Sequence, residues 1–321
     1  MKIDRTFAAL AGLAAFAASF GSATSAQSPS AAPATSAGAA DANESIVVTG
    51  DRLTPAQARQ RAVAFIAATG VAAGDTPVAR WVDPVCPKAV GLVERHAAIV
   101  ERRMRRIADE AGIRVAPEDC QGNIEVRFTA NSDEVLRQFQ ARAPRRLAQV
   151  TGASRERLLA DPQPIRWWYS TGLRTRHGMS SQSSGPNWIN ICGSATGAGS
   201  GMPSGVPSVY HYNSSMVSTQ AVRALVDAVV LIDISRIEQM PLESIAAFAA
   251  MVAFAEIRES DFAATGSILG LFENGPTAPR ALTEWDMAFL RVLYRLPLDR
   301  DARRHRGILV RDLLAAVEAG G

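Results

Sequence analysis

The chain has 321 residues, of which 34 are basic and 31 acidic, and its apolar content of 47% is ordinary for a globular protein. The nearly balanced charge argues against a nucleic-acid partner. Only two lysines are present, Lys2 and Lys88, and the neighbours of Lys88 imply no partner for it, so catalysis by a lysine nucleophile is not expected.

The first 26 residues have the pattern of a secretory signal peptide. A short basic start precedes an apolar stretch over residues 6–20, which is too short to span a bilayer, and small residues then mark a cleavage site between Ala26 and Gln27. A membrane anchor is the alternative interpretation. We therefore expect an exported protein, periplasmic or secreted, that is not an integral membrane protein after cleavage.

Residues 27–45 consist of Ala, Ser, Pro and Gly with almost no large apolar side chain. Such a segment cannot bury enough surface to offset the entropy of ordering it, so it is predicted to be a disordered linker. About 275 residues follow, enough for one large domain or two small ones.

Residues 46–150 are predicted to form an N-terminal α/β subdomain. A capping Thr, a Pro and a Gln, followed later by Gly70, predict a helix over 55–69. Apolar residues at alternating spacings of four and three predict a second helix over 88–111, whose other face carries Arg and Glu four residues apart and reads as a salt-bridged surface.

Three cysteines remain after the signal peptide, and two of them are expected to pair in an oxidising compartment. Cys86 lies just before the second helix and Cys120 just after it, in the turn that leads to the next strand, so a bond between them would attach the helix to the sheet. In the loop-entropy model such a loop contributes about 3–4 kcal/mol. Cys192 is then left over, and its simplest role is an inert thiol.

Period-2 alternation predicts a strand over 124–128, and Asn131 with Glu134 caps a third helix that ends near residue 143. A subdomain boundary is expected at 150–163, followed by a C-terminal α+β subdomain over 160–318. Its expected elements are an aromatic strand at 165–169, a long Ser/Gly-rich loop at 180–208, a return strand at 209–212, a buried central strand at 225–234, an apolar helix from Pro241 to near Ile257, a helix capped by Thr283 and Asp286, and a last helix at 303–318. Together these elements predict an α+β fold with a small mixed sheet packed against several helices.

Candidate catalytic groups gather on the loop over residues 177–211. His177, His211 and an aspartate such as Asp227 or Asp233 could form a three-ligand metal site, and Cys192 could act as a thiolate beside either histidine. None of the four histidines lies in a zinc-protease motif, so no metal or cofactor is predicted.

Two further patterns have structural explanations. The Gly/Ser-rich run at 193–201 matches neither a phosphate-binding loop nor a nucleophile elbow and is expected to be a flexible loop. Asp227, Asp233 and Glu256 adjoin apolar segments, and we expect these carboxylates to cap backbone amides or to pair with arginines.

Several short motifs of the second half carry a family resemblance: the strand before Arg236, the helix 244–257, Ser-Ile-Leu and Leu-Phe within 267–272, and Leu-Thr-Glu-Trp-Asp at 282–286 running into Leu293-Tyr294. Over about residues 160–295 the chain resembles a family of exported Gram-negative proteins of unknown function that is related to zinc-protease-like (zincin-like) domains. The resemblance implies a zincin-like scaffold. In the peptidase-like relatives the helix matching 244–257 carries the zinc ligands, but here it has no His, so no catalytic residue is carried over.

The leading hypothesis is a non-catalytic role in envelope binding or assembly, with an envelope protein as partner. One alternative is a metal- or thiol-dependent hydrolase on the 177–211 loop. Another is a small-ligand or lipid binder lined by Trp167, Trp168, Tyr169 and Trp188, although core packing is the simpler role for these side chains.

Overall fold

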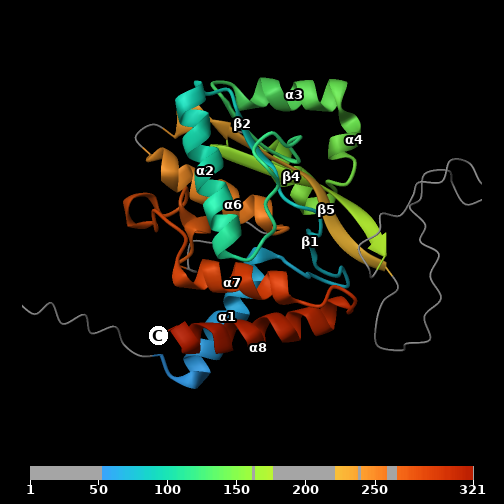
Figure 1. Cartoon of the computed structure of the whole chain (residues 1–321), viewed down its shortest axis with the longest axis vertical. Coiled ribbons are helices and arrows are strands. Elements are labelled where there is room, and N and C mark those ends of the chain that lie inside the picture. Colours follow the sequence, from blue (N-terminus) through green and yellow to red (C-terminus); the bar gives the residue numbers. More distant parts are fainter. Residues whose placement is uncertain (1–52, 161–162, 176–220, 238–239, 259–265, 321) are drawn as a thin grey trace, which may run out of the picture. The chain divides into compact units, whose positions relative to one another are not determined.

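The structure is a computed structural model that describes residues 53–160, 163–175, 221–237, 240–258 and 266–320 (Figure 1). The expected signal peptide with its cleavage site, the linker and the 177–211 loop lie outside these residues. The described residues all belong to one compact unit. In the described part of this unit, no helix combines the length and the apolar character needed to cross a membrane.

Five strands within the described residues form one mixed sheet, which confirms the predicted α+β class. Its central strand is β5, with β4 antiparallel along one side, β1 and β3 parallel along the other, and β2 parallel beside β3. Strands from both sides of the expected boundary at 150–163 share this sheet, so the segments 46–150 and 160–318 do not build separate sheets. The strands are β1 Ala79–Trp81, β2 Pro87–Val90, β3 Ile124–Thr129, β4 Ile165–Thr175 and β5 Ala221–Asp233.

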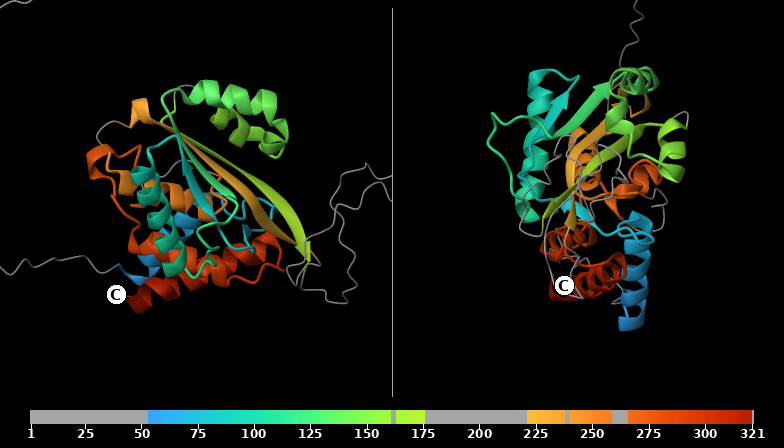
Figure 2. Two further views of the ribbon diagram at one scale, coloured as in Figure 1. Left: turned by 45° about the horizontal axis from the view of Figure 1, so that its top comes forward. Right: turned by 90° about the vertical axis from the view of Figure 1, so that its right-hand side faces the viewer.

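Helices cover both faces of the sheet, as Figure 2 shows. The larger hydrophobic core lies between one face and α1, α2, α6, α7 and α8, whereas α3, α4 and α5 enclose a smaller core on the other face. The described helices are α1 Pro55–Thr69, α2 Glu94–Glu110, α3 Ser132–Arg142, α4 Pro144–Leu147, α5 Gly152–Leu159, α6 Leu242–Phe254, α7 Glu284–Arg295 and α8 Ala302–Gly320.

Strand β5 contributes to both cores because its side chains alternate between the two faces. Ala228, Val230 and Ile232 lie in the larger core, and Val229 and Leu231 lie in the smaller one. The predicted buried central strand is thereby confirmed. A β-bulge interrupts the pairing with β4 at Ser170 and Thr171, whose partners are Asp227 and Leu225, so Val226 is an extra residue with 41% of its surface exposed.

Local capping signals predicted three helix starts correctly. At α1, Thr54 and Gln57 form a capping box, and Gly70 ends the helix with a φ of 62°. At α3, the Asn131 side chain accepts a hydrogen bond from the Glu134 amide at 2.9 Å. At α7, Thr283 and Asp286 form a second capping box.

The predicted start of the second helix is wrong, because α2 begins at Glu94 and not at residue 88. Residues Pro87–Val90 form β2 instead, since they pair in parallel with β3. Gly91 makes the turn from β2 to α2 with a φ of 89°, and a Cβ at this position would collide with the carbonyl group of Phe128. The predicted end of α6 is also wrong, because this helix ends at Phe254 and not near Ile257.

The predicted disulfide between Cys86 and Cys120 is confirmed, with the two Cα atoms 6.1 Å apart. It joins the residue before β2 to the connection between α2 and β3, which are 34 residues apart in sequence. In the loop-entropy model a crosslink of this separation stabilises the fold by about 4 kcal/mol.

Candidate binding groove beside strand β4

The residues proposed for catalysis, His177, Cys192 and His211, lie outside the described part of the chain, as does Trp188. Within the described ranges no group of three His, Cys, Asp or Glu side chains could hold a metal ion.

The two aspartates considered as metal ligands have other partners, as the ion-pairing and capping prediction requires. Arg146 binds Asp227 through two hydrogen bonds of 2.7 and 3.0 Å. Asp233 accepts hydrogen bonds from the Ser132 amide at 3.1 Å and from the Ser235 hydroxyl at 2.5 Å. Burial tends to raise the pKa of Asp233, but these hydrogen bonds hold that pKa below its usual value.

His305 is buried, and its two ring nitrogens hold parts of the fold together. Its Nδ1 accepts a hydrogen bond from the Val78 amide at 3.1 Å, and its Nε2 lies 3.0 Å from the carbonyl oxygen of Pro297, to which it donates when the ring is neutral. Burial lowers the pKa of His305, so the neutral ring is favoured.

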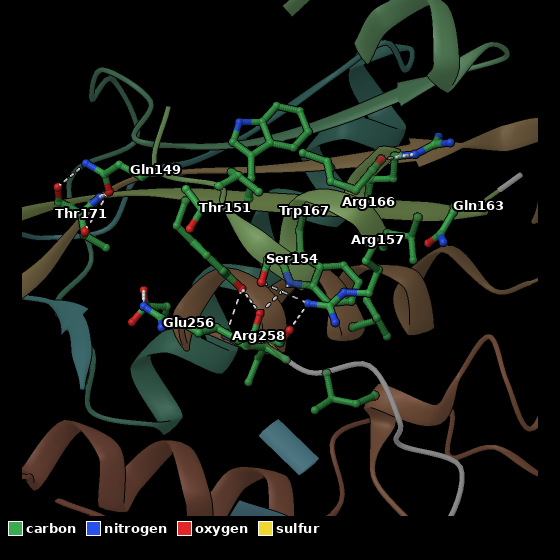
Figure 3. Close-up of a pocket in the computed structure, with 18 of the residues that line it drawn as sticks. Gln149, Thr151, Ser154, Arg157, Gln163, Arg166, Trp167, Thr171, Glu256 and Arg258 are labelled. Atoms are coloured by element: carbon green, nitrogen blue, oxygen red, sulfur yellow. Dashed lines mark hydrogen bonds and ion pairs between the residues drawn. The ribbon is translucent and has the colours of Figure 1, made fainter. Parts of the chain in front are cut away.

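A groove of about 740 Å³ lies along the outer edge of β4. Figure 3 shows Gln149 beside Thr171 at one end of the groove and Gln163 at the other, with Ser154 and Arg157 between them. Opposite this row the groove is lined by the segment after α6 and by the turn near residues 269–273. Residues that are far apart in sequence therefore enclose one elongated space.

Arg166 holds α5 beside the strand. Only 1% of its side chain is exposed, and its guanidinium donates to the carbonyl oxygen of Leu158 at 3.1 Å, to the hydroxyl of Ser132 at 2.5 Å and to the carboxylate of Asp133 at 2.5 Å. A buried guanidinium is stable only when its donors are satisfied. These bonds fix the end of α5 and the start of α3 against one face of β4.

Trp167 and Tyr169 hold the other wall. The indole Nε1 of Trp167 donates to the carbonyl oxygen of Ile257 at 2.9 Å. The hydroxyl of Tyr169 donates to the carbonyl oxygen of Val252 at 2.6 Å and accepts from the Ile257 amide at 3.1 Å. Burial raises the pKa of Tyr169 well above its usual value, so this hydroxyl keeps its proton and remains a donor.

Aromatic rings form the apolar part of this wall. Phe248 packs edge-to-face against Trp167 at a centroid distance of 5.9 Å and against Phe272 at 4.9 Å. Trp168, in contrast, points into the smaller core, where it packs against Phe139 at 5.0 Å. Core packing, the simpler role expected for the aromatic strand, therefore holds for Trp168, although both Trp167 and Trp168 also line the groove.

Arginines outnumber carboxylates on the floor of the groove, which is formed by Arg157, Arg223, Glu256 and Arg258. Glu256 is buried and accepts two hydrogen bonds from Arg223, at 2.8 and 2.9 Å, and one from Arg258 at 2.6 Å. Arg157 donates to the carbonyl oxygen of Arg258 and to the Ser154 hydroxyl, and it forms no ion pair within the described residues. Arg223 and Arg258 thus share the carboxylate of Glu256. With Arg157, Arg166 and Glu273 included, the described lining carries four guanidinium groups and two carboxylates, which leaves it positive.

The backbone of β4 supplies the most distinctive feature of the groove. The Pro164 carbonyl accepts a hydrogen bond from the Asp233 amide at 3.0 Å, so even-numbered residues of β4 bond to β5. Odd-numbered residues up to 171 therefore direct their N–H and C=O groups outward. Within the described chain no group pairs with the outward N–H and C=O groups of Ile165, Trp167 and Tyr169.

At Thr171 a side chain takes the place of a neighbouring strand. The Thr171 amide donates to Oε1 of Gln149 at 2.7 Å, and Nε2 of Gln149 donates back to the Thr171 carbonyl at 2.8 Å. This is the pair of hydrogen bonds that one residue of an added antiparallel strand would make with its N–H and C=O groups. The edge of β4 is therefore already paired by Gln149 at Thr171, whereas the outward groups of Ile165, Trp167 and Tyr169 have no partner in the described chain.

Sequence reasoning singled out Trp167 and Glu256 but missed Gln149, Arg157 and Arg258. No motif surrounds these three residues. The sequence signal that could have indicated the groove was the aromatic segment at 165–169. Its position at the edge of the sheet, however, depends on pairing with residues far away in sequence.

Comparisons of the chain with protein-family models, curated proteins and solved structures found no match. The zincin-like resemblance of residues 160–295 therefore stays a prediction.

Proposed function

We propose that the protein is an exported, non-catalytic binding protein that takes up an extended peptide segment of an envelope protein as a sixth strand beside β4. The observation that carries the proposal is the row of outward backbone groups at Ile165, Trp167 and Tyr169, which face the groove without a partner in the described chain.

An unpaired strand edge is a template for another strand, because each outward N–H and C=O needs a hydrogen-bond partner. Peptide-binding domains use such edges, with main-chain bonds giving affinity and alternate side chains giving specificity. The free edge from Ile165 to Tyr169 is about 13 Å long at 3.3 Å per residue, which suits a segment of about five residues.

The opposite edge of the sheet lacks such a row. Strand β2 has only four residues, and the outward amide of Ala89 donates to the Glu101 carboxylate at 2.9 Å. The disulfide at Cys86 also restrains the start of this strand. A partner segment therefore has a longer and less protected template at β4 than at β2.

The side chains around the groove suggest which segment it takes. Alternate residues of an added strand would face Trp167, Phe248 and Phe272, which favours an apolar side chain there. Arg157 and Arg258 favour an acidic side chain nearby, because the floor carries more guanidinium groups than carboxylates. We propose a segment that combines apolar and acidic residues.

Two observations support a non-catalytic role. The described residues that line the groove include no His or Cys, and Glu256 is held by two arginines. The buried residues of α6 also include no His, so a zincin-like scaffold, which we retain as part of the proposal, would have no zinc ligands on this helix. The Cys86–Cys120 disulfide supports export.

The test is a selection from a displayed hexapeptide library on the purified protein, compared with two variants of α5. Ser154→Trp places a large side chain in the groove, whereas Ala153→Trp places the same side chain on the exposed neighbouring position. We expect selected peptides to bind the wild type and Ala153→Trp and to lose at least tenfold in affinity for Ser154→Trp. Peptides that bind all three proteins equally, or no selected peptide at all, would contradict the proposal.

A further inference from the structure

A second cavity, of about 590 Å³, lies where β1 ends and β5 begins. Its described walls come from residues 80–83, from Gly112 and Arg114 after α2, from Val222, and from residues 294–299 between α7 and α8. It shares no described lining residue with the groove beside β4.

Arg80 is the unusual residue of this cavity. One Nη donates to the carbonyl oxygen of Leu296 at 3.3 Å, the guanidinium lies 5.4 Å from the centre of the Tyr294 ring, and its Nε has no hydrogen-bond partner in the described chain. Burial lowers the pKa of Arg80, but an arginine keeps its charge in a protein. No carboxylate of the described residues pairs with this charge, although a largely buried charge normally has a partner.

The other charged groups of the cavity leave it positive. Arg114 donates to the backbone carbonyl of Val82, and neither it nor Arg295 forms an ion pair in the described chain. The two lining acids already have arginine partners outside the lining: Arg174 binds Asp83 at 2.7 Å, and Arg300 binds Asp299 at 2.7 Å. Three arginines therefore line the cavity, and each of its two carboxylates is already paired with an arginine outside the lining.

We propose that this cavity binds a phosphate group through Arg80, Arg114 and Arg295. Guanidinium groups match phosphate oxygens in geometry and charge, and several of them around one cavity bind the anion more tightly than a single group would. Pro297, Leu298 and Val222 provide apolar surface beside the anion, suited to an organic phosphate or to a lipid headgroup. The site does not depend on the peptide groove.

The experiment is calorimetric titration of the full chain with inorganic phosphate, and separately its binding to vesicles of phosphatidylcholine with and without phosphatidylglycerol, at constant ionic strength. Arg114→Gln changes a guanidinium that is anchored to the fold through a backbone carbonyl and forms no described ion pair, and Arg80→Gln removes the partly buried charge. Arg137→Gln, on the exposed face of α3, is the matched control.

We expect both cavity variants to weaken binding at least tenfold and the control to leave it unchanged. Binding of inorganic phosphate would identify a free phosphate compound as the ligand, whereas binding only to vesicles that contain phosphatidylglycerol would identify a lipid headgroup. Absence of both, or equal binding by all variants, overturns the proposal. If Arg80→Gln does not fold, Arg114→Gln decides.

Discussion

Two buried tryptophans provide a matched pair for measuring one hydrogen bond. Trp81 is 3% exposed, and its indole nitrogen donates to the carbonyl oxygen of Ala253 at 2.8 Å. Trp168 is 2% exposed, but its indole nitrogen has no partner within the described chain. Replacement by Phe removes the same atoms at both sites, so the losses from transfer and cavity formation are similar.

The hydrogen-bonding state of the indole nitrogen changes the free energy of unfolding in opposite directions at the two sites. Trp81→Phe loses a net contribution of about 1 kcal/mol and leaves a buried carbonyl without its partner, whereas Trp168→Phe removes a donor whose burial already costs about 1–3 kcal/mol. We expect the free energy of unfolding, from urea titrations followed by circular dichroism, to fall by about 2 kcal/mol more for Trp81→Phe than for Trp168→Phe. An equal or larger loss for Trp168→Phe would show that the hydrogen bond of Trp81 does not stabilise the fold.

Three further predictions concern the rest of the fold. Because burial lowers the pKa of His305, the neutral ring's contribution to stability is complete above the unfolded-state pKa of about 6.5 and is lost as the pH falls toward the folded-state pKa. In urea titrations, the free energy of unfolding should therefore fall more between pH 7.5 and pH 5 in the wild type than in His305→Gln. Equal losses in the two proteins would contradict this. Replacing Cys86 and Cys120 together by Ser should lower the free energy of unfolding by about 3–4 kcal/mol in the same titration, and a loss below 1 kcal/mol would count against a loop-entropy origin. Gln149→Ala should cost only about 1 kcal/mol, because water replaces its bonds to Thr171 at this exposed position, and a loss above 3 kcal/mol would show that the side chain does more than pair with the strand edge.

The sequence predicted those elements whose signals are local. The capping side chains at Thr54, Asn131 and Thr283 act within one helical turn, so the helices after them begin where expected. The start of α2 was predicted wrongly because residues 87–90 pair with β3. The spacing of apolar residues in so short a segment fits a helix as well as a strand.

The site was less predictable than the fold, for a physical reason. Whether β4 lies at an edge depends on which strands pair, and this is decided by contacts between residues 46 to 67 positions apart. The ion pairing of Glu256 was expected in kind, but its partners Arg223 and Arg258 were not. The role of Gln149 depends on a single outward-facing residue, Thr171, and no pattern in sequence marks such a pair.

Hydrogen exchange at the edge of β4 distinguishes strand addition from other modes of peptide binding. In the free protein, the amides of Trp167 and Tyr169 should exchange fast and those of Trp168 and Ser170 slowly, because only the latter bond to β5. With a selected peptide bound, we expect the amides of Trp167 and Tyr169 to become protected at least tenfold, while those of Trp168 and Ser170 change little. Unchanged exchange at Trp167 and Tyr169 in the saturated complex would contradict strand addition at this edge.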